Sequence, residues 1–340
     1  MNWNKIKRLE IPNALSKILK RGESPSSADM KLCLSSGLSA LENEQKIIRP
    51  LNNSGNPGGL IKLKPGGYFI IIPDLHARMD FFSEVMSWSG FSGRPVYKDM
   101  ADGRAQVICV GDAFHSEARG RNRWKKAMNE WLAGYKQHRN MDKEMRENLG
   151  LLQMIILMKT AFPKQFHFLK GNHENIANEQ GQGNFPFRKF VYEGEMVKLW
   201  TEKFMGSEVF ELIYRWEKLL PLMAEGPDFL ISHCEPGRSL TPEEVINAYE
   251  SSDVIYNLTW VDNGQAEDGS AAETLANFSK NTETGRIFGG HRAVSGEFEL
   301  RQDGRYVQIN TPNKWVIAAV ADIEIFKPDR DIICLKDDSE

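Results

Sequence analysis

Short apolar runs recur along the chain from about residue 66 onward, and each of them ends in glycine, proline, aspartate or histidine. Longer amphipathic or irregular stretches separate these runs. Short buried strands that alternate with helices produce such a pattern. We therefore predict an α/β domain over residues 66–325.

Three other segments have a different texture. Residues 1–65 alternate helical patches with serine-rich and glycine-rich punctuation, which predicts an N-terminal helical extension and a linker. Within residues 117–153, apolar residues recur at helical spacing among many charges, which predicts a helical insertion. A solvated face is the favoured interpretation of these charges, and a substrate or partner surface is the alternative. Residues 326–340 are charged, and we expect this C-terminal tail to fray.

The composition is that of an ordinary globular protein. With 340 residues and 41% apolar content, the chain can bury a full core. Its net charge of -3 gives no chain-wide reason to expect nucleic acid or an anionic membrane as partner. The four cysteines are widely separated, which indicates a reduced, cytoplasmic protein. The first 21 residues lack the apolar stretch of a secretory signal, and the longest apolar runs are too short to span a bilayer, so we expect neither export nor membrane anchoring.

Five of the apolar runs lead directly into residues that can bind a metal ion. In chain order these are Asp74 and His76, then Asp112, Asn172, His233 and His291. A single histidine or aspartate at a strand end is usually structural, but open α/β sheets bind ligands at the carboxyl ends of their strands, where all six could converge. Oxygen and imidazole donors without a thiolate suit two divalent ions, manganese or iron, with zinc as an alternative.

The same strand ends carry three short motifs: Asp74-Leu75-His76, Gly111-Asp112 with Arg119-Gly120, and Gly171-Asn172-His173-Glu174. Together with His233 and Gly290-His291 they resemble the motifs of the calcineurin-like metallophosphoesterases, and within these the phosphoprotein phosphatase branch. The resemblance extends from about Phe69 to Asp322. It implies a four-layer α-β-β-α sandwich, in which two mixed sheets pack face to face with helices outside.

The resemblance also implies roles for the site residues. The implied metal ligands are Asp74 and His76 for the first ion, Asp112 as a bridge, and Asn172, His233 and His291 for the second. A hydroxide that bridges the two ions would attack phosphorus in line. His173 would protonate the leaving oxygen, and Arg119 would bind the phosphoryl group through its planar guanidinium.

Some positions depart from the pattern of the family. Pro73 precedes and Ala77 follows the first motif, where the family usually has glycine. The phosphoprotein branch orients its acid histidine with an aspartate just before the Arg-Gly pair, but this chain has Ala118 there. His115 and Glu117 lie nearby in the sequence, and Glu117 is our candidate for the orienting carboxylate.

Two further departures concern the later motifs. The phosphoprotein branch has a second phosphate-binding arginine, but no arginine occurs between Trp260 and Lys280. Arg238 and Arg292 are the candidates to replace it. Many relatives outside that branch have a second histidine where this chain has Ala293. The phosphoprotein branch also lacks this histidine.

These features predict a metal-dependent phosphatase that hydrolyses phosphate monoesters, with phosphoserine or phosphothreonine in proteins as the leading substrate. A small phosphate ester is the alternative substrate, hydrolysed by a phosphodiesterase or dinucleoside polyphosphate hydrolase of the same fold. A scaffold that has lost catalysis is a rival from another class, which the intact set of ligands opposes. Only the basic residues of the insertion favour a nuclease, so nucleic acid is not expected as a partner.

Overall fold

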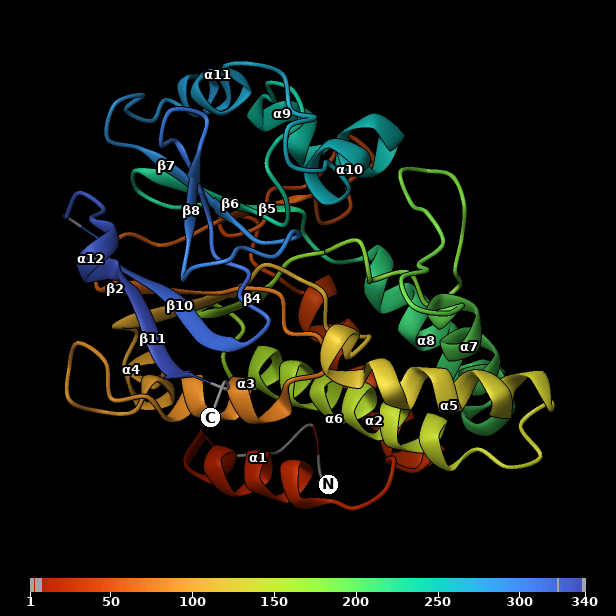
Figure 1. The fold of residues 1–340 in the computed structure, drawn as a ribbon. Helices are drawn as coiled ribbons and strands as arrows, with labels where there is room; N and C mark the ends of the chain where they lie inside the picture. The colour runs from red at the N-terminus through yellow and green to blue at the C-terminus, as the bar shows by residue number, and fades with distance from the viewer. Residues whose placement is uncertain (1–2, 4–7, 323, 338–340) are drawn as a thin grey trace.

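Two β-sheets form the centre of the molecule (Figure 1). The structure is a computed structural model that describes residues 3, 8–322 and 324–337; residues 1–2 and 4–7 of the predicted extension and 338–340 of the predicted tail lie outside the described residues. The five-stranded sheet has the order β11-β10-β2-β3-β4, and the six-stranded sheet has the order β1-β5-β6-β7-β9-β8.

Both sheets are mixed. The strands of the first sheet are β2 (Tyr68–Ile72), β3 (Ala105–Cys109), β4 (Phe166–Phe168), β10 (Lys314–Ala321) and β11 (Ile332–Asp337). Those of the second are β1 (Leu60–Lys62), β5 (Met223–Glu225), β6 (Phe229–Ser232), β7 (Arg286–Gly289), β8 (Glu299–Arg301) and β9 (Tyr306–Gln308). Parallel pairing joins β2 to β3 to β4 and β6 to β7 to β9, whereas β10 runs antiparallel to β2. The five strands predicted from the apolar runs are confirmed as β2, β3, β4, β6 and β7.

The strand residues alternate between two cores. In β2, Phe69 and Ile71 belong to the apolar cluster between the sheets, whereas Ile70 and Ile72 belong to the cluster under the helices. Successive side chains of a strand point to opposite faces, so an unbroken apolar run is buried on both sides. The predicted four-layer sandwich is thereby confirmed, because each sheet has one face toward the other sheet and one face toward helices.

Helices cover the outer face of each sheet. Those on the side of the first sheet, or beside it, are α1 (Ile11–Lys20), α2 (Ser27–Glu42), α3 (Met79–Ser87), α4 (Val96–Ala101), α5 (Arg121–Leu132), α6 (Arg139–Ala161), α7 (Glu193–Trp200) and α8 (Ser207–Lys218). The second sheet is covered by α9 (Pro242–Ile246), α10 (Ser252–Thr259) and α11 (Ser270–Asn277). Short turns of helix are η2 (Arg8–Glu10), η3 (Glu117–Gly120), η4 (Thr201–Met205) and η5 (Ala248–Glu250).

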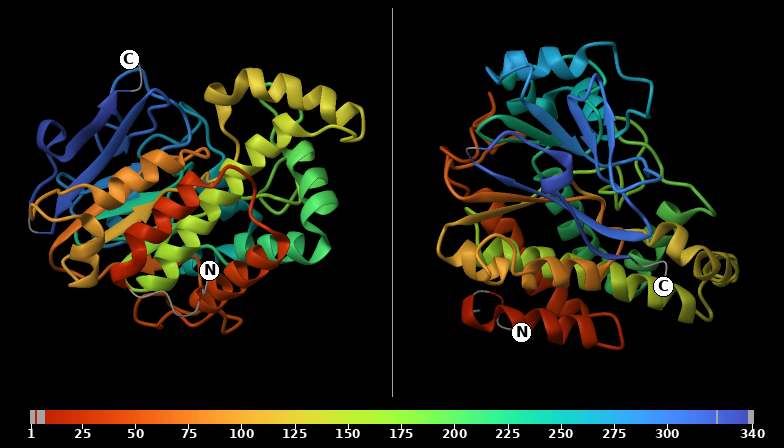
Figure 2. Two further views of the ribbon diagram at one scale, coloured as in Figure 1. Left: turned by 90° about the horizontal axis from the view of Figure 1, so that it is seen from below. Right: turned by 60° about the vertical axis from the view of Figure 1, so that its left-hand side comes forward.

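The described residues of the first 65 pack onto the rest of the chain. Helix α1 lies beneath α3 and α6, on the side away from the sheet (Figures 1 and 2). Helix α2 packs between α6 and α8, and its buried Met30 and Leu34 belong to the same core cluster as α6. Strand β1 pairs with β5 in the second sheet. The division of the chain at residue 65 stays a prediction, but this segment contributes to both the helical layer and a sheet.

The predicted insertion at residues 117–153 is helical. Helix α5 exposes most of its charged residues and buries Trp124 and Ala127, as a solvated helix would. Helix α6 runs eight residues beyond the predicted end and is buried along most of its length. Because α6 packs against α1, α2, α3 and β4, it is a central element of the helical layer rather than a solvated one.

The tail expected to fray after residue 326 forms α12 (Pro328–Asp331) and β11, which pairs antiparallel with β10. The expectation is therefore wrong for these residues. Buried Ile332 packs into the core between the sheets. Buried Asp331 accepts a hydrogen bond of 2.8 Å from the backbone nitrogen of Lys327. These two contacts hold the segment against the rest of the protein, although its many charged residues led us to expect a frayed, solvent-exposed tail.

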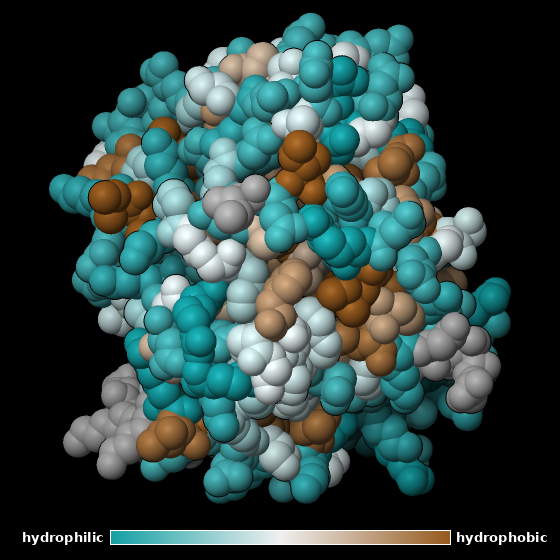
Figure 3. Space-filling model, turned by 90° about the vertical axis from the view of Figure 1, so that its left-hand side faces the viewer, coloured by the Kyte–Doolittle hydropathy of each residue, from teal (hydrophilic) through white to brown (hydrophobic). Residues whose placement is uncertain are grey.

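The face of the molecule drawn in Figure 3 is mostly polar. Hydrophilic side chains cover most of the face in Figure 3, and the hydrophobic ones lie in separate groups. Among the helices of the described ranges, none has the length and apolar content that crossing a bilayer requires. Most of the buried apolar residues belong to three core clusters.

Candidate metal centre

The carboxyl ends of β2, β3, β4, β6 and β7 meet at one place between the two sheets. All six candidate ligands lie in the loops that leave these strands: Asp74 and His76 after β2, Asp112 after β3, Asn172 after β4, His233 after β6 and His291 after β7. Their side chains are buried or nearly so. Parallel strands bring their carboxyl ends to the same edge, so residues far apart in the sequence converge.

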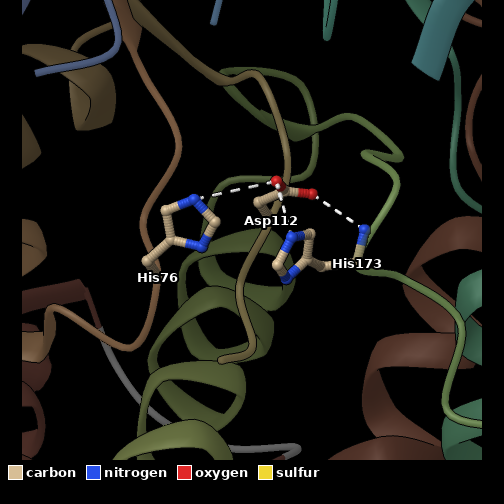
Figure 4. A group of neighbouring side chains, drawn as sticks. All are labelled: His76, Asp112 and His173. Carbon is tan, nitrogen blue, oxygen red and sulfur yellow. Dashed lines mark hydrogen bonds and ion pairs between the residues drawn. The ribbon is translucent and has the colours of Figure 1, made fainter. Parts of the chain in front are cut away.

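Asp112 lies at the centre of this group. Its Oδ2 atom is 3.5 Å from Nε2 of His233 and 3.8 Å from Nε2 of His76. Figure 4 shows the ring of His76 directed at the carboxylate of Asp112 from one side and His173 lying on another. A carboxylate between two imidazoles from different sheets has the position required of a ligand shared by two ions.

Asn172 joins the two histidines of the second sheet. Its Oδ1 atom is 2.9 Å from Nε2 of His233 and 3.1 Å from Nδ1 of His291. An amide oxygen and two imidazole nitrogens so close together are oriented as ligands of one cation would be. These atoms and Asp112 form the second half of the centre.

The outward nitrogen of each candidate ligand histidine faces an acceptor. In His233, Nδ1 is 3.1 Å from the carbonyl oxygen of Val110, and in His76, Nδ1 is 3.5 Å from that of Phe114. In His291, Nε2 is 3.5 Å from Oδ1 of Asp262. A carbonyl can only accept, so in His233 and His76 the proton lies on Nδ1, and Nε2 keeps its lone pair for a metal. No pattern in the sequence indicated that Asp262 would face His291.

Buried polar atoms without partners indicate that these residues fit metal ions. Within the described residues, Oδ1 of Asp74 is buried and has no hydrogen-bond partner, and Asn310 donates to the other oxygen, Oδ2, of this carboxylate. Burial raises the pKa of Asp74 to about 7, and burial followed by Glu174 raises that of Asp112. Two carboxylates that are costly to ionise together need positive charge nearby, which divalent cations supply.

Two glycines leave room around the carboxylates. A Cβ atom on Gly290 would lie 2.3 Å from Oδ1 of Asp74, and one on Gly171 would lie 2.2 Å from Oδ1 of Asp112. Any side chain at these positions would therefore displace a candidate ligand. Steric exclusion of a side chain thus explains why glycine precedes His291 and Asn172 in this chain.

The backbone at the centre is strained at several residues. His76, Ala77, Asp112 and His291 have positive φ angles of 42°, 61°, 56° and 65°. This left-handed region is unfavourable for residues with a Cβ atom and persists where surrounding contacts enforce it. Ala77 thus adopts a backbone conformation that glycine adopts at lower cost.

Glu174 holds two of the loops together. Its carboxylate accepts hydrogen bonds from the backbone nitrogens of Asp112 at 2.9 Å, Ala113 at 2.8 Å and Gly171 at 2.7 Å. It thereby fixes the loop after β3 against the loop after β4. The sequence placed Glu174 in a motif, but its supporting role became apparent only from these contacts.

His173 approaches the same carboxylate as the ligands do. Its Nε2 atom is 3.7 Å from Oδ2 of Asp112, and its backbone nitrogen donates a 2.9 Å hydrogen bond to Oδ1 (Figure 4). Glu117, the candidate for orienting this ring, is 3.9 Å from the same Nε2 and forms an ion pair with Lys189. The opposite nitrogen, Nδ1, is 2.8 Å from Nδ1 of His115. Glu117 therefore faces Nε2 of His173, whereas a residue that orients the ring through Nδ1 must lie on the opposite side.

The arginines lie at different distances from the centre. Arg119 donates to the carbonyl oxygens of His76 and Ala77 at 3.4 and 3.3 Å, and it pairs with Glu147 at 2.9 Å. Its side chain is 44% exposed, so it remains accessible to a substrate.

Arg292 and Arg238 differ as candidates for the second phosphate-binding arginine. Arg292 forms an ion pair with Asp262, which also faces His291. Arg238 instead pairs with Glu244 and Asp253. Only Arg292 is therefore connected to the centre through these ion pairs.

Comparisons with known proteins identify a sequence family and solved structures that are similar to this chain. The family model of calcineurin-like phosphoesterases matches residues 67–295. A protein serine/threonine phosphatase from Saccharomyces cerevisiae superposes with a TM-score of 0.63 at 13% identity, covering 98% of this chain and 97% of that chain. A cold-active protein-tyrosine phosphatase from a Shewanella species gives a TM-score of 0.44 at 13% identity, covering 81% and 82%. A sequence search among curated proteins finds no significant match.

The family match covers more than half of the chain and includes every strand end at the centre. The structural likeness at 13% identity shows the shared fold. Members of the matched family depend on a dinuclear metal site, and the described residues include His and Asp clusters that could hold ions. The chain belongs to the calcineurin-like phosphoesterase family, and is thus a metal-binding phosphoric ester hydrolase.

Proposed function

We propose that the protein is a phosphatase that hydrolyses phosphate monoesters, with phosphoserine or phosphothreonine side chains of proteins as its substrates. The observation that carries the proposal is the place of His173, whose Nε2 lies 3.7 Å from the shared carboxylate of Asp112. An alkoxide is a poor leaving group, so hydrolysis of a serine phosphate needs a proton donor beside the metal centre.

In this proposal, Asp74, His76, Asp112, Asn172, His233 and His291 hold two ions, manganese or iron. Ions held there would supply a nucleophile at neutral pH and neutralise the phosphoryl oxygens. Asp112 aligns the two halves of the centre. Glu174 keeps its loop rigid, so that the bound ester is held in one orientation.

His173 gives a proton from Nε2 to the leaving oxygen as the bond to phosphorus breaks. Such a proton donor typically contributes about 10² to 10⁴ in rate. Arg119 binds the phosphoryl group through its fork of N–H donors, which suits a tetrahedral oxyanion. Its ion pair with Glu147 holds the guanidinium beside His76 before the substrate arrives.

We further propose a cytoplasmic location. All four cysteines are free, and three of them are buried. Free thiols are typical of proteins that stay in a reducing compartment.

The test measures hydrolysis by metal-free protein resupplied with manganese. The substrates are a phosphoserine peptide, para-nitrophenyl phosphate and its bis-ester, and the variants are Asp112→Asn and His173→Asn. His138→Asn is the matched control, because His138 pairs with Asp142 outside the centre. We expect manganese-dependent hydrolysis of the peptide that both site variants lose and the control keeps.

Other outcomes would redirect the proposal. Preference for the bis-ester would assign the protein as a phosphodiesterase, and a small phosphate anhydride as the preferred substrate would assign it as a dinucleoside polyphosphate hydrolase. If the protein hydrolyses none of these substrates with manganese, iron or zinc, the remaining hypothesis is a non-catalytic scaffold of the same fold.

A further inference from the structure

The side chain of a second histidine, His115, contacts the ring of His173, the proposed proton donor. Nδ1 of His115 lies 2.8 Å from Nδ1 of His173, and the two side chains belong to residues that are 4% and 5% exposed. His115 leaves the loop after β3 with a φ angle of 67°, which turns its ring toward the loop after β4. The pair thus joins the loops that carry Asp112 and Asn172.

The chemistry of this contact restricts the protons of both rings. Two imidazole nitrogens at 2.8 Å share one proton, because one must donate and the other accept. For His173 to give its Nε2 proton and become a neutral ring, it must keep a proton on Nδ1. His115 then accepts that hydrogen bond through its unprotonated Nδ1. Burial lowers the pKa of His115 to about 3, which agrees with a neutral acceptor.

Packing holds the two rings in place. Phe187 stacks on His115 with ring centroids 4.8 Å apart and an interplanar angle of 28°, and its centroid is 3.9 Å from that of His173. The ring centroid of Trp124 in α5 lies 6.0 Å from that of His115. A ring packed against aromatic side chains keeps its orientation, so the hydrogen bond between the imidazoles has a fixed direction.

The nearby carboxylate of Glu117 does not contact Nδ1 of His173. Glu117 faces Nε2 of His173, and its other oxygen is 2.7 Å from Nζ of Lys189. It therefore stands on the substrate side of the ring, whereas the orienting contact must come from Nδ1. Within the described residues, His115 is the partner that the hydrogen-bond geometry gives to this nitrogen.

We propose that His115 is a positioning residue for the hydrolysis: it accepts a hydrogen bond from Nδ1 of His173 and so directs the Nε2 proton toward the leaving oxygen. The inference rests on the proposed function of His173 as proton donor. The proton passes from Nε2 to the ester oxygen as the P–O bond breaks. The neutral His173 that remains keeps its proton on Nδ1, which still donates its hydrogen bond to His115.

The kinetic test uses the dependence on the leaving group. The variant His115→Phe keeps an aromatic ring against Phe187 but removes the nitrogen. We expect a roughly 10- to 100-fold lower kcat on phenyl phosphate, part of the effect of a general acid, with KM nearly unchanged. On para-nitrophenyl phosphate, whose leaving group departs without a proton, we expect less than about a twofold change. His115→Asn, which retains an acceptor oxygen, should recover part of the loss.

A double variant checks that the two histidines act together. If His115 acts only through His173, then His115→Phe combined with His173→Asn is no slower on phenyl phosphate than His173→Asn alone. Equal losses on both esters in His115→Phe, or no loss on either, would overturn the inference. If wild-type protein hydrolyses neither ester, the proposed function itself has failed, and the next experiment still tests the contact.

That experiment observes the hydrogen bond without substrate or metal. The chain has seven histidines, so nitrogen-15 labelling of histidine gives a tractable NMR spectrum. We expect one strongly downfield Nδ1-bound proton that disappears in both His115→Phe and His173→Asn and persists in His138→Asn. Manganese affinity should be the same in His115→Phe and wild type. Absence of this proton in the wild type, or a lost metal affinity in His115→Phe, contradicts the inference.

Discussion

Asp262 lies 3.5 Å from Nε2 of His291, on the side of the ring that faces away from Asn172. A carboxylate behind a ligand histidine fixes its tautomer and increases its basicity toward a metal. Asp262 also forms an ion pair with Arg292, which neutralises its charge on the solvent side. This contact connects the surface of the second sheet to the metal centre.

Replacing Asp262 should weaken metal binding. We expect Asp262→Ala to lower the affinity for one manganese ion by about 10- to 100-fold, because His291 loses the group that orients it. Calorimetric titration of the metal-free protein measures this affinity. Arg292→Ala is the control, since it breaks the same ion pair and leaves Asp262 in place. Equal losses in the two variants would show that the ion pair, rather than the support of His291, is what matters.

Metal removal should destabilise the protein. At a free manganese concentration 100 times the dissociation constant, we expect the free energy of unfolding to increase by about 2.7 kcal/mol for each ion bound, since only the folded chain holds the ligands together. Urea denaturation with and without manganese measures the difference. In Asp112→Asn the increase should vanish, whereas the metal-free variant should be at least as stable as the metal-free wild type, because a buried carboxylate has been neutralised. A manganese effect that persists in this variant would argue against Asp112 as the shared ligand.

Arg119 should matter for the substrate and little for stability. A charge-assisted hydrogen bond to a phosphoryl oxygen contributes about 1.5–3 kcal/mol, so Arg119→Ala should lower kcat/KM roughly 10- to 100-fold. Its half-exposed ion pair with Glu147 contributes about 0–1 kcal/mol, so the unfolding midpoint should hardly move. Arg238→Ala, which removes ion pairs with Glu244 and Asp253, should leave kcat/KM unchanged. A fall in kcat/KM of similar size in this control would rule out a specific role for Arg119.

A buried ionic cluster connects the segment after α2 to the helical layer. The carboxylate of Glu44 pairs with Lys159 of α6 and, at 2.9 Å, with Arg49, all three being nearly inaccessible. Removing one partner leaves buried charges uncompensated, so Glu44→Gln should lower the free energy of unfolding by about 3–5 kcal/mol. Glu42→Gln is the control, because Glu42 pairs with Arg215 at the surface and should change stability by less than about 1 kcal/mol. Chemical denaturation at pH 7 distinguishes the two.

The same cluster should make stability depend on pH. Burial, followed by Lys159, lowers the pKa of His167 to about 4, below its ordinary value of 6.5. Between these values the unfolded chain binds a proton that the folded chain does not, so stability decreases as the pH falls from about 6.5 to 4. His167→Gln should flatten this part of the curve of unfolding free energy against pH. An unchanged slope in the variant would mean that another group titrates there.

Much of the centre could be predicted from local patterns. Each apolar run predicted a strand, and the polar residue after it marked the end of that strand at the ligand-binding edge. The structure brings Asp74, His76, Asp112, Asn172, His233 and His291 together there. Strand formation and strand ends depend on neighbouring residues, so a single sequence contains the information needed for them.

The residues behind the centre were harder to predict. His115 and His173 are 58 positions apart, and Glu174 holds a nitrogen 62 positions earlier. Nothing in the residues around His115 distinguishes it from a surface histidine, and the prediction favoured Glu117 because a carboxylate was expected. The C-terminal strand was missed for a similar reason, since its pairing with β10 depends on an edge that only the folded sheet offers.

The sequence by itself determined the class of the fold, the strands that carry the centre and the identity of the candidate ligands, because these follow from residue periodicity and from motifs of a few residues. The tertiary structure alone decided which side chains contact those ligands and the proposed proton donor from behind, namely Asp262 at His291, Glu174 across two loops and His115 at His173. The physical reason is that a hydrogen bond requires donor and acceptor within about 3 Å, and the path of the loops that sets this distance is fixed by packing of the whole chain.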